Sequence, residues 1–222
     1  MAMAENVAEV TSQAGLPAHE QVYRSLREAV LFGALAPGEP VTIQGLVERL
    51  GAGMTPVREA IRRLTAEGAL QAMGNRRIQV PVLTAALVEE LTEVRLALEP
   101  RLAMRAADRA DAEDVARLTA IDAHLDRAIQ RGDIEGYLRE NHRFHTCLND
   151  MADAPIMTAL ADSLWLRFGP SLRVVCGQVG TRHLPDCHKD LVRALAAGDG
   201  ALAARAIEED LVQGMDVVLN SL

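Results

Sequence analysis

A short basic segment that follows a glycine-containing turn constrains the fold of this chain more than any other feature. Residues 50–64 read Leu-Gly-Ala-Gly-Met-Thr-Pro-Val-Arg-Glu-Ala-Ile-Arg-Arg-Leu. Apolar side chains recur at the spacing of one helix face, at Val57, Ala60, Ile61 and Leu64. Thr55 is expected to cap this helix, Pro56 to take its first position, and Gly68 to end it. A core-anchored helix with arginines near its N-terminus is typical of the recognition helix that a helix-turn-helix inserts into the major groove of DNA.

The segments on both sides of this helix have the order of a winged helix-turn-helix. Residues 21–33 carry apolar side chains at helical spacing, and Thr42 can cap a short helix that follows. After Gly68 the pattern changes to alternation, which predicts a hairpin over residues 69–80. Arg63 is expected to pair with Glu59 one turn earlier. The candidate DNA contacts lie on the basic helix and at the hairpin tip: Thr55, Arg58, Arg62, Arg63, Arg76 and Arg77.

This N-terminal part resembles the DNA-binding domain of bacterial transcription regulators of the GntR family. The resemblance is carried by Tyr-Arg-Ser-Leu-Arg-Glu-Ala-Val at 23–30, Pro-Gly-Glu at 37–39, Thr-Pro-Val-Arg-Glu-Ala-Ile at 55–61 and Glu-Gly at 67–68. It implies that Arg58 contacts DNA. Gly53 and Met54 stand where the family usually has Ser-Arg, and Arg77 stands where it usually has glycine. We therefore expect an operator that departs from the family norm and an added contact from the wing.

The charge of the chain is divided unequally. The formal net charge is −8, yet residues 17–82 hold eight arginines and six acidic residues. The acidic excess lies mostly in residues 83–222, so a modestly positive DNA-binding head is joined to an acidic body. The three cysteines do not suggest a disulfide framework. Without a membrane-length apolar run or a signal peptide, we expect a cytoplasmic protein whose residues 1–16 form a flexible tail.

The remainder of the chain has a helical period almost throughout, so the fold class is mostly α. The expected helices are at about 85–108, 111–131, 134–151, 155–176, 182–197 and 200–220. About six helices with short connections predict an all-α antiparallel bundle. The domains are therefore expected at 17–82 and 83–222, with the boundary near Pro81. Residues 95–103 and 195–199 resemble the FCD effector domain of the FadR-like branch of GntR regulators.

Polar residues interrupt the apolar stripes of four bundle helices. They are Arg95, Asn141, His145, His188 and Asp210, and each shares a helix face with leucine, isoleucine or alanine. A buried polar group costs a few kcal/mol unless it has a partner. Polar groups from four helices that point toward one core therefore predict a shared polar pocket, although each could instead find an isolated hydrogen bond. His124 and His142 lie off these stripes and are expected at the surface.

The resemblance also implies a metal, because FCD domains of this type commonly hold a divalent ion with an Asp-x-x-x-His pair and two later histidines. The matching positions are Asn141, His145, His188 and Asp210, so an amide replaces the first carboxylate and a carboxylate replaces the last histidine. Two imidazoles and one carboxylate suit Zn, Ni, Fe or Mn. Asn141 is a weak ligand that would act through a water or bind the effector. The alternative is a metal-free pocket that binds the effector directly.

Arg95 indicates an anionic ligand. An inward guanidinium cannot lose its proton, so it must meet either Glu99 one turn on or the carboxylate of a ligand. Arg139 and Arg173 are further candidates for the effector site, and the resemblance favours a small carboxylic acid. The sequence thus predicts a homodimeric regulator that binds a two-fold DNA operator under control of a metabolite. A non-haem metal enzyme and an architectural DNA-binding protein without an effector are the competing hypotheses.

Overall fold

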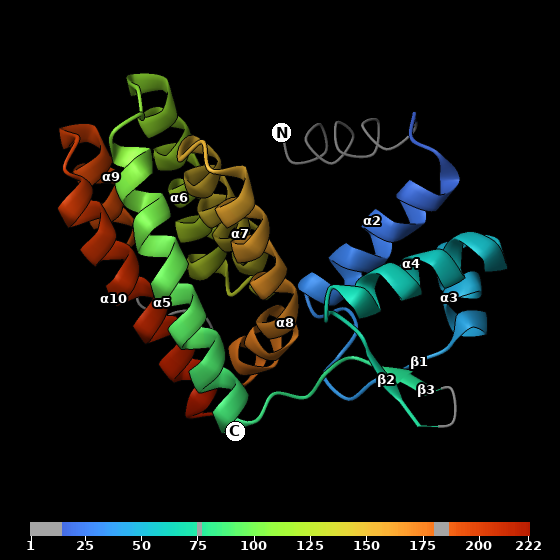
Figure 1. Ribbon diagram of the computed structural model, residues 1–222. Coiled ribbons are helices and arrows are strands. Elements are labelled where there is room, and N and C mark those ends of the chain that lie inside the picture. The colour runs from blue at the N-terminus through green and yellow to red at the C-terminus, as the bar shows by residue number, and fades with distance from the viewer. Residues whose placement is uncertain (1–14, 75–76, 180–186) are drawn as a thin grey trace.

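The computed structural model describes residues 15–74, 77–179 and 187–222, which form a small head and a larger helical bundle (Figure 1). The head contains α2 (Ala18–Leu31), β1 (Pro40–Val41), α3 (Ile43–Leu50), α4 (Met54–Ala66), β2 (Gln71–Met73) and β3 (Arg77–Gln79). The bundle contains α5 (Ala85–Ala107), α6 (Ala112–Arg131), α7 (Ile134–Met151), α8 (Pro155–Val179), α9 (His188–Ala197) and α10 (Gly200–Leu219). None of the described helices is long and apolar enough to span a bilayer. The mostly α fold with a winged helix-turn-helix and a bundle is confirmed.

The recognition helix α4 buries the face that its sequence predicts. Its buried side chains are Val57, Ala60, Ile61 and Leu64. Thr42 caps α3 by accepting a hydrogen bond from the Gly45 amide, also as predicted. The start of α4 was predicted wrongly, because the helix begins at Met54 after Gly53 and Thr55 makes no capping bond. Pro56 is therefore the third helical residue, where it is tolerated because first-turn amides have no partner within the helix.

The wing has three strands rather than the expected two. The strand order is β1-β3-β2, and both pairs are antiparallel. Pro40 and Val41 of β1 pair with β3, a contact between segments that alternation within residues 69–80 could not show. Arg77 begins β3 and is exposed, whereas Arg76 lies outside the described residues.

The bundle helices end where the sequence breaks their pattern, with two exceptions. Asp111 forms a capping box with Asp114 at the start of α6, and Gly132 ends that helix with φ +67°. Helix α8 continues to Val179, three residues beyond its predicted end. Helix α9 begins at His188 rather than 182, and residues 182–186 lie outside the described part of the chain.

One continuous apolar core joins the head to the bundle. Leu26 and Val30 of α2 belong to the same buried cluster as Trp165 and Phe168 of α8. The two helices approach closely at Gly169, where a Cβ would lie 2.4 Å from the Leu31 carbonyl oxygen. The head is thereby packed directly against α8 of the bundle.

Candidate metal centre and nucleic-acid interface

The exposed face of α4 carries three arginines in different surroundings. Arg58 is exposed and makes no ion pair with the residues that the structure describes. Arg62 pairs with Glu59 at 2.5 Å, so the expected pair of Glu59 with Arg63 was wrong by one residue. Arg63 instead lies 3.0 Å from Glu20 of α2 and 3.3 Å from Glu67. Its guanidinium also stacks 3.4 Å from the centre of the Tyr23 ring.

The arginines of α4 therefore differ in whether their side chains are already engaged within the protein. Arg58 is free to meet a base edge, and Thr55 and Met54 are exposed beside it at the start of the helix. Arg62 keeps most of its side chain in solvent. Arg63 holds α4 against α2, so its removal affects the fold of the head as well as any DNA contact.

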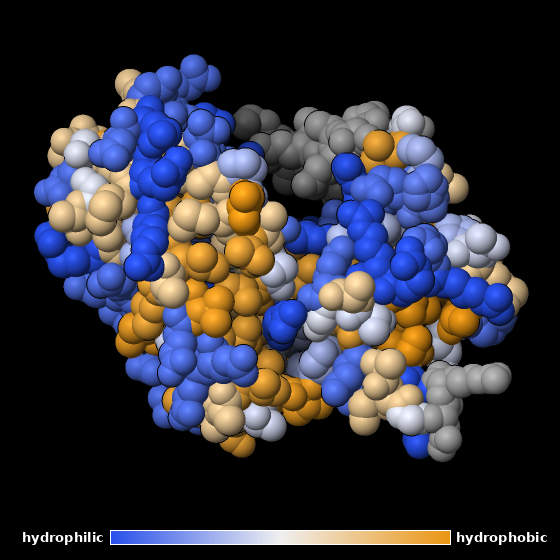
Figure 2. Space-filling view, viewed as in Figure 1, coloured by the Kyte–Doolittle hydropathy of each residue, from blue (hydrophilic) through white to orange (hydrophobic). Residues whose placement is uncertain are grey.

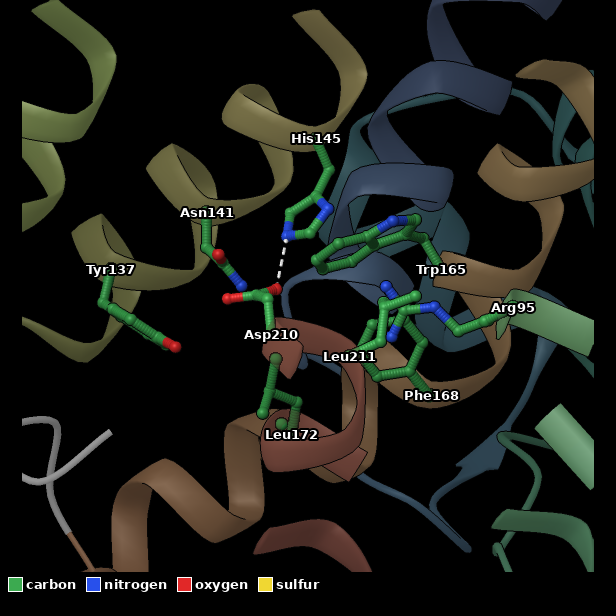
Figure 3. Close-up of a pocket in the computed structure, with 10 residues that line it drawn as sticks. Arg95, Tyr137, Asn141, His145, Trp165, Phe168, Leu172, Asp210 and Leu211 are labelled. Carbon is green, nitrogen blue, oxygen red and sulfur yellow. Dashed lines mark ion pairs between the residues drawn. The ribbon is translucent and has the colours of Figure 1, made fainter. Parts of the chain in front are cut away.

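A small cavity of about 40 Å³ lies inside the bundle (Figure 3). Its lining comes from α5, α7, α8 and α10 and consists of Arg95, Tyr137, Asn141, His145, Trp165, Phe168, Leu172, Asp210, Leu211 and Gly214. We call it the inner cavity. The predicted inward residues Arg95, Asn141, His145 and Asp210 therefore meet at one place. The prediction from helical periodicity is confirmed for these four positions.

His145, His188 and Asp210 form a compact group of potential metal ligands. One donor atom from each lies within 4.8 Å of the others. The Nε2 atom of His145 is 3.3 Å from Asp210 Oδ2, and the Nε2 atom of His188 is 3.8 Å from Asp210 Oδ1. Both imidazoles are almost fully buried, and the Asp210 side chain is 16% exposed. Three donors from three helices thus converge at the edge of the inner cavity.

Each imidazole also has a carboxylate near its Nδ1 atom, on the side of the ring away from Asp210. Glu99 Oε2 is 3.5 Å from His145 Nδ1, and Asp122 Oδ1 is 3.3 Å from His188 Nδ1. A carboxylate at Nδ1 fixes the orientation of a histidine and increases its basicity as a ligand. Both Nε2 atoms are therefore directed toward Asp210. This donor set and its supporting carboxylates fit a divalent metal ion.

Within this group, Arg95, His145, Glu99 and Asp210 balance one another in charge without a metal. Burial lowers the pKa of His145, but the carboxylates of Asp210 and Glu99 outweigh burial and raise it to about 9. Burial raises the pKa of Asp210 and of Glu99, yet the imidazolium and the Arg95 guanidinium hold both below the usual range. Two cations and two anions thus compensate one another inside the bundle.

Arg95 takes one of the two alternatives that the sequence left open. Its Nε is 2.6 Å from Glu99 Oε1, and both side chains are almost fully buried. A second nitrogen of the guanidinium is 3.3 Å from Glu99 Oε2, so the pair is bidentate. The guanidinium also lies 4.4 Å from the centre of the Phe168 ring. Arg95 lines the inner cavity, and the terminal nitrogen that does not meet Glu99, Nη1, lies 3.5 Å from the Met215 sulfur.

Comparison with known families assigns both parts of the chain. Residues 18–80 match the bacterial regulatory proteins of the gntR family, and residues 90–213 match the FCD domain. The chain belongs to the GntR family. It is a DNA-binding transcription regulator with an FCD domain, and its relatives are regulators rather than enzymes.

Several individual proteins are similar over most of their length. The chain is 28% identical to the HTH-type transcriptional regulator McbR of Escherichia coli K12 over 202 residues, which cover 89% of this chain and 91% of McbR. It is 27% identical to the repressor RspR of the same organism, with 88% and 86% covered. A solved structure of E. coli McbR/YncC superposes with a TM-score of 0.86 at 26% identity and covers 93% of this chain and 99% of that chain.

Two of the predicted effector residues of this GntR regulator lie elsewhere. Arg139 and Arg173 do not line the inner cavity but border a separate cavity between α2 and the bundle. The expectation that they join Arg95 in one pocket was therefore wrong. His142 is not a surface residue either, because it packs against Phe32 and Trp165 at the same junction. His124 is partly exposed and lies 3.9 Å from Glu140.

The sequence did not lead us to three residues that lie at the inner cavity or beside the potential metal ligands of this GntR regulator. Asp122 is polar within the buried stripe of α6, the same signal that identified the other inward residues. Tyr137 precedes Asn141 by one turn of α7 and lines the cavity with it. Trp165 is an apolar residue of a buried helix, and nothing in its local pattern indicates that it borders a cavity.

Proposed function

We propose that this GntR regulator binds a two-fold DNA operator as a homodimer, and that a small carboxylate bound in the inner cavity controls its operator affinity. A divalent ion, Zn, Ni, Fe or Mn, would be held by His145, His188 and Asp210, with Asn141 acting through a water. The observation that carries the metal proposal is that both imidazoles turn Nε2 toward Asp210 while buried carboxylates stand behind Nδ1. A bound ion would supply positive charge to anchor the carboxylate of the effector.

The size of the inner cavity limits the effector. A volume of about 40 Å³ has room for only a few waters. An ion and one carboxylate group fit this space, whereas a larger metabolite requires side chains to move. Arg95 is the side chain whose movement would both enlarge the cavity and free a bidentate donor.

A metal-free effector site is the second candidate, and the charge balance of the group favours it. The positive charge of a protonated His145 would take the electrostatic role of the metal, since the imidazolium ring lies between Asp210 at Nε2 and Glu99 at Nδ1. Direct binding of a carboxylate would then depend on Arg95 and Asn141. The two candidates differ in whether an ion accompanies the purified chain.

An apolar face on the bundle supports the homodimer. Exposed large apolar side chains follow the outward faces of α5 and α8, at Leu87, Val94, Ile156 and Leu160. Figure 2 shows apolar surface gathered over this part of the bundle. Such patches commonly mark interaction sites, and a two-fold dimer would place two reading heads on two half-sites of DNA. We propose that residues 83–222 supply this interface, that residues 17–82 read DNA, and that the protein acts in the cytoplasm.

The test begins with DNA sequences selected from a random library by the purified full-length chain. Operator affinity is then measured by fluorescence anisotropy against a panel of mono-, di- and tricarboxylates, with metal-loaded and chelator-treated protein in parallel. A carboxylate that changes affinity only for loaded protein supports the metal-assisted site. A change that survives chelation supports direct binding, and no response to any carboxylate contradicts the proposed effector class.

A further inference from the structure

A second cavity, of about 350 Å³, lies between the head and the bundle. One wall comes from α2 and the turn that follows it, including Glu28 and Phe32. The opposite wall comes from α7 and α8, including Arg139 and Arg173. We call it the junction cavity. A ligand bound there would touch both domains at once.

Arg139 is already neutralised by acidic neighbours. Its guanidinium lies 3.2 Å from Glu135 and 3.6 Å from Glu28, and it stacks 4.5 Å from the centre of the Phe32 ring. These contacts join α7 to the C-terminal end of α2. Arg139 therefore has no need of an additional anion.

Arg173 is in a different situation. Its aliphatic stem packs against Gly33, where an added Cβ would lie 2.5 Å from the Arg173 Cβ. Gly33 has φ +66°, so glycine both permits the turn and leaves room for this approach. The side chain is partly buried, and no hydrogen bond or ion pair to its guanidinium is found within residues 15–74, 77–179 and 187–222.

This arrangement favours an anion from solution. A guanidinium cannot become neutral by losing its proton, and a partly desolvated charge without a counterion is unfavourable. Its planar fork matches the oxygens of a carboxylate or a phosphate. The carboxylates of Glu28 and Glu135 border the same cavity. They would repel a ligand that carried a second negative group.

We propose that the junction cavity is a second ligand site, which binds a small anion with one carboxylate or phosphate group on Arg173 and its body against Phe32. The site is separate from the inner cavity and does not depend on the metal. Because its walls belong to both domains, the bound anion would hold α2 against α8 and so fix the position of the reading head.

Calorimetric titration of the full-length chain tests the proposal, with inorganic phosphate and benzoate as the two probes. At least one probe should bind with one site per chain, and the stronger of the two identifies the preferred anionic group. Arg173→Met keeps the stem against Gly33 and removes the charge, so it should weaken binding at least about tenfold. Arg143→Met removes an exposed charge on α7 outside the cavity and should leave the affinity unchanged.

Two further measurements separate this site from the inner cavity and from a folding defect. His145→Ala should leave binding of either probe unchanged, which distinguishes failure of the metal proposal from failure of this one. Hydrogen exchange of the wild type should show slower exchange at residues 28–35 with saturating probe. No saturable binding of either probe at millimolar concentration overturns the proposal. Equal binding by folded Arg173→Met, or unchanged exchange at residues 28–35, overturns it as well.

Discussion

Arg27 of α2 and Asp162 of α8 form an ion pair across the boundary between the reading head and the bundle, with 2.5 Å between nitrogen and oxygen. The other oxygen of the same carboxylate is 3.5 Å from His142 Nε2. Burial raises the pKa of Asp162, but His142 and Arg27 outweigh it and hold the pKa below its usual range. Asp162 is therefore a charged anchor that holds the head in place.

Removing the charge of Asp162 should weaken the attachment of α2 to the bundle. Asp162→Asn is expected to speed hydrogen exchange in α2 and to cost about 1 kcal/mol of unfolding free energy, because the pair is partly exposed. A double-mutant cycle with Arg27→Met should give a coupling of at least about 0.5 kcal/mol. Asp190→Asn, which breaks an exposed pair within α9, is the control and should leave α2 unchanged. A coupling near zero would contradict the anchor.

The affinity of the head for its DNA operator should depend on Arg58. Arg58→Ala is expected to weaken binding of the selected operator by about 1–3 kcal/mol, because this arginine is exposed and has no ion pair in the described head. Anisotropy titration measures the loss. Arg131→Ala on the bundle is the control. Undiminished affinity of Arg58→Ala would mean that another surface meets DNA. Met54→Arg adds a cation beside Arg58 and should strengthen binding at moderate salt.

The protonation of His145 should appear in the pH dependence of stability. Its pKa of about 9 in the folded protein exceeds the usual 6.5, so the folded state holds the proton more tightly. The stabilisation is fully present below about pH 6.5 and is lost as pH rises through about 9. Denaturant unfolding of metal-free protein should give about 3 kcal/mol less unfolding free energy at high pH. His145→Gln should remove this dependence, and a flat wild-type profile would contradict a protonated His145.

Metal content decides between the two candidates for the inner cavity. Elemental analysis should find close to one divalent ion per chain, and His188→Ala should lose both the ion and the stability that it confers. Asn141→Asp should tighten binding by adding a charged ligand, and affinity should rise with pH because His145 must release its proton first. His142→Ala lies outside the donor group and should keep its metal. A wild type that never binds an ion favours direct effector binding.

The apolar face of α5 and α8 should determine the oligomeric state. Leu160→Glu places a charge on an exposed leucine of this face and should shift the full-length chain from dimer to monomer in light scattering. Met73→Glu makes the same kind of change on an exposed residue of the wing, so it should leave the dimer intact. Dissociation by Met73→Glu alone would move the interface to the head.

The sequence pattern of a single helix predicted which of its side chains face the bundle core. It could not predict which side chains are covered by a segment from elsewhere in the chain. The inward positions Asn141 and His145 follow from a period of 3.6 residues on α7 alone. The same helix places His142 about 100° away, which reads as surface in an isolated bundle. In the folded chain Phe32, which directly follows α2, packs on that face and contacts both His142 and Arg139.

The sequence pattern also could not predict which charged residues form ion pairs. Arg63 could meet Glu59 on its own helix, yet it pairs with Glu20 because α2 passes beside α4. The start of α4 depends on the extended backbone of Gly53 at the turn from α3, and Thr55 gives no signal of that. Asp122 was within reach of the sequence, since it interrupts the buried stripe of α6 as His145 interrupts that of α7.

Trp165 is the only tryptophan in the sequence. Its ring lies 5.1 Å from His145 on the side of the inner cavity and 5.1 Å from His142 on the side of the domain junction. Emission excited selectively through indole therefore comes from one position, which lines the inner cavity and contacts His142 at the junction of the two domains. The chain carries an intrinsic optical reporter, so events in the bundle can be followed in unlabelled protein.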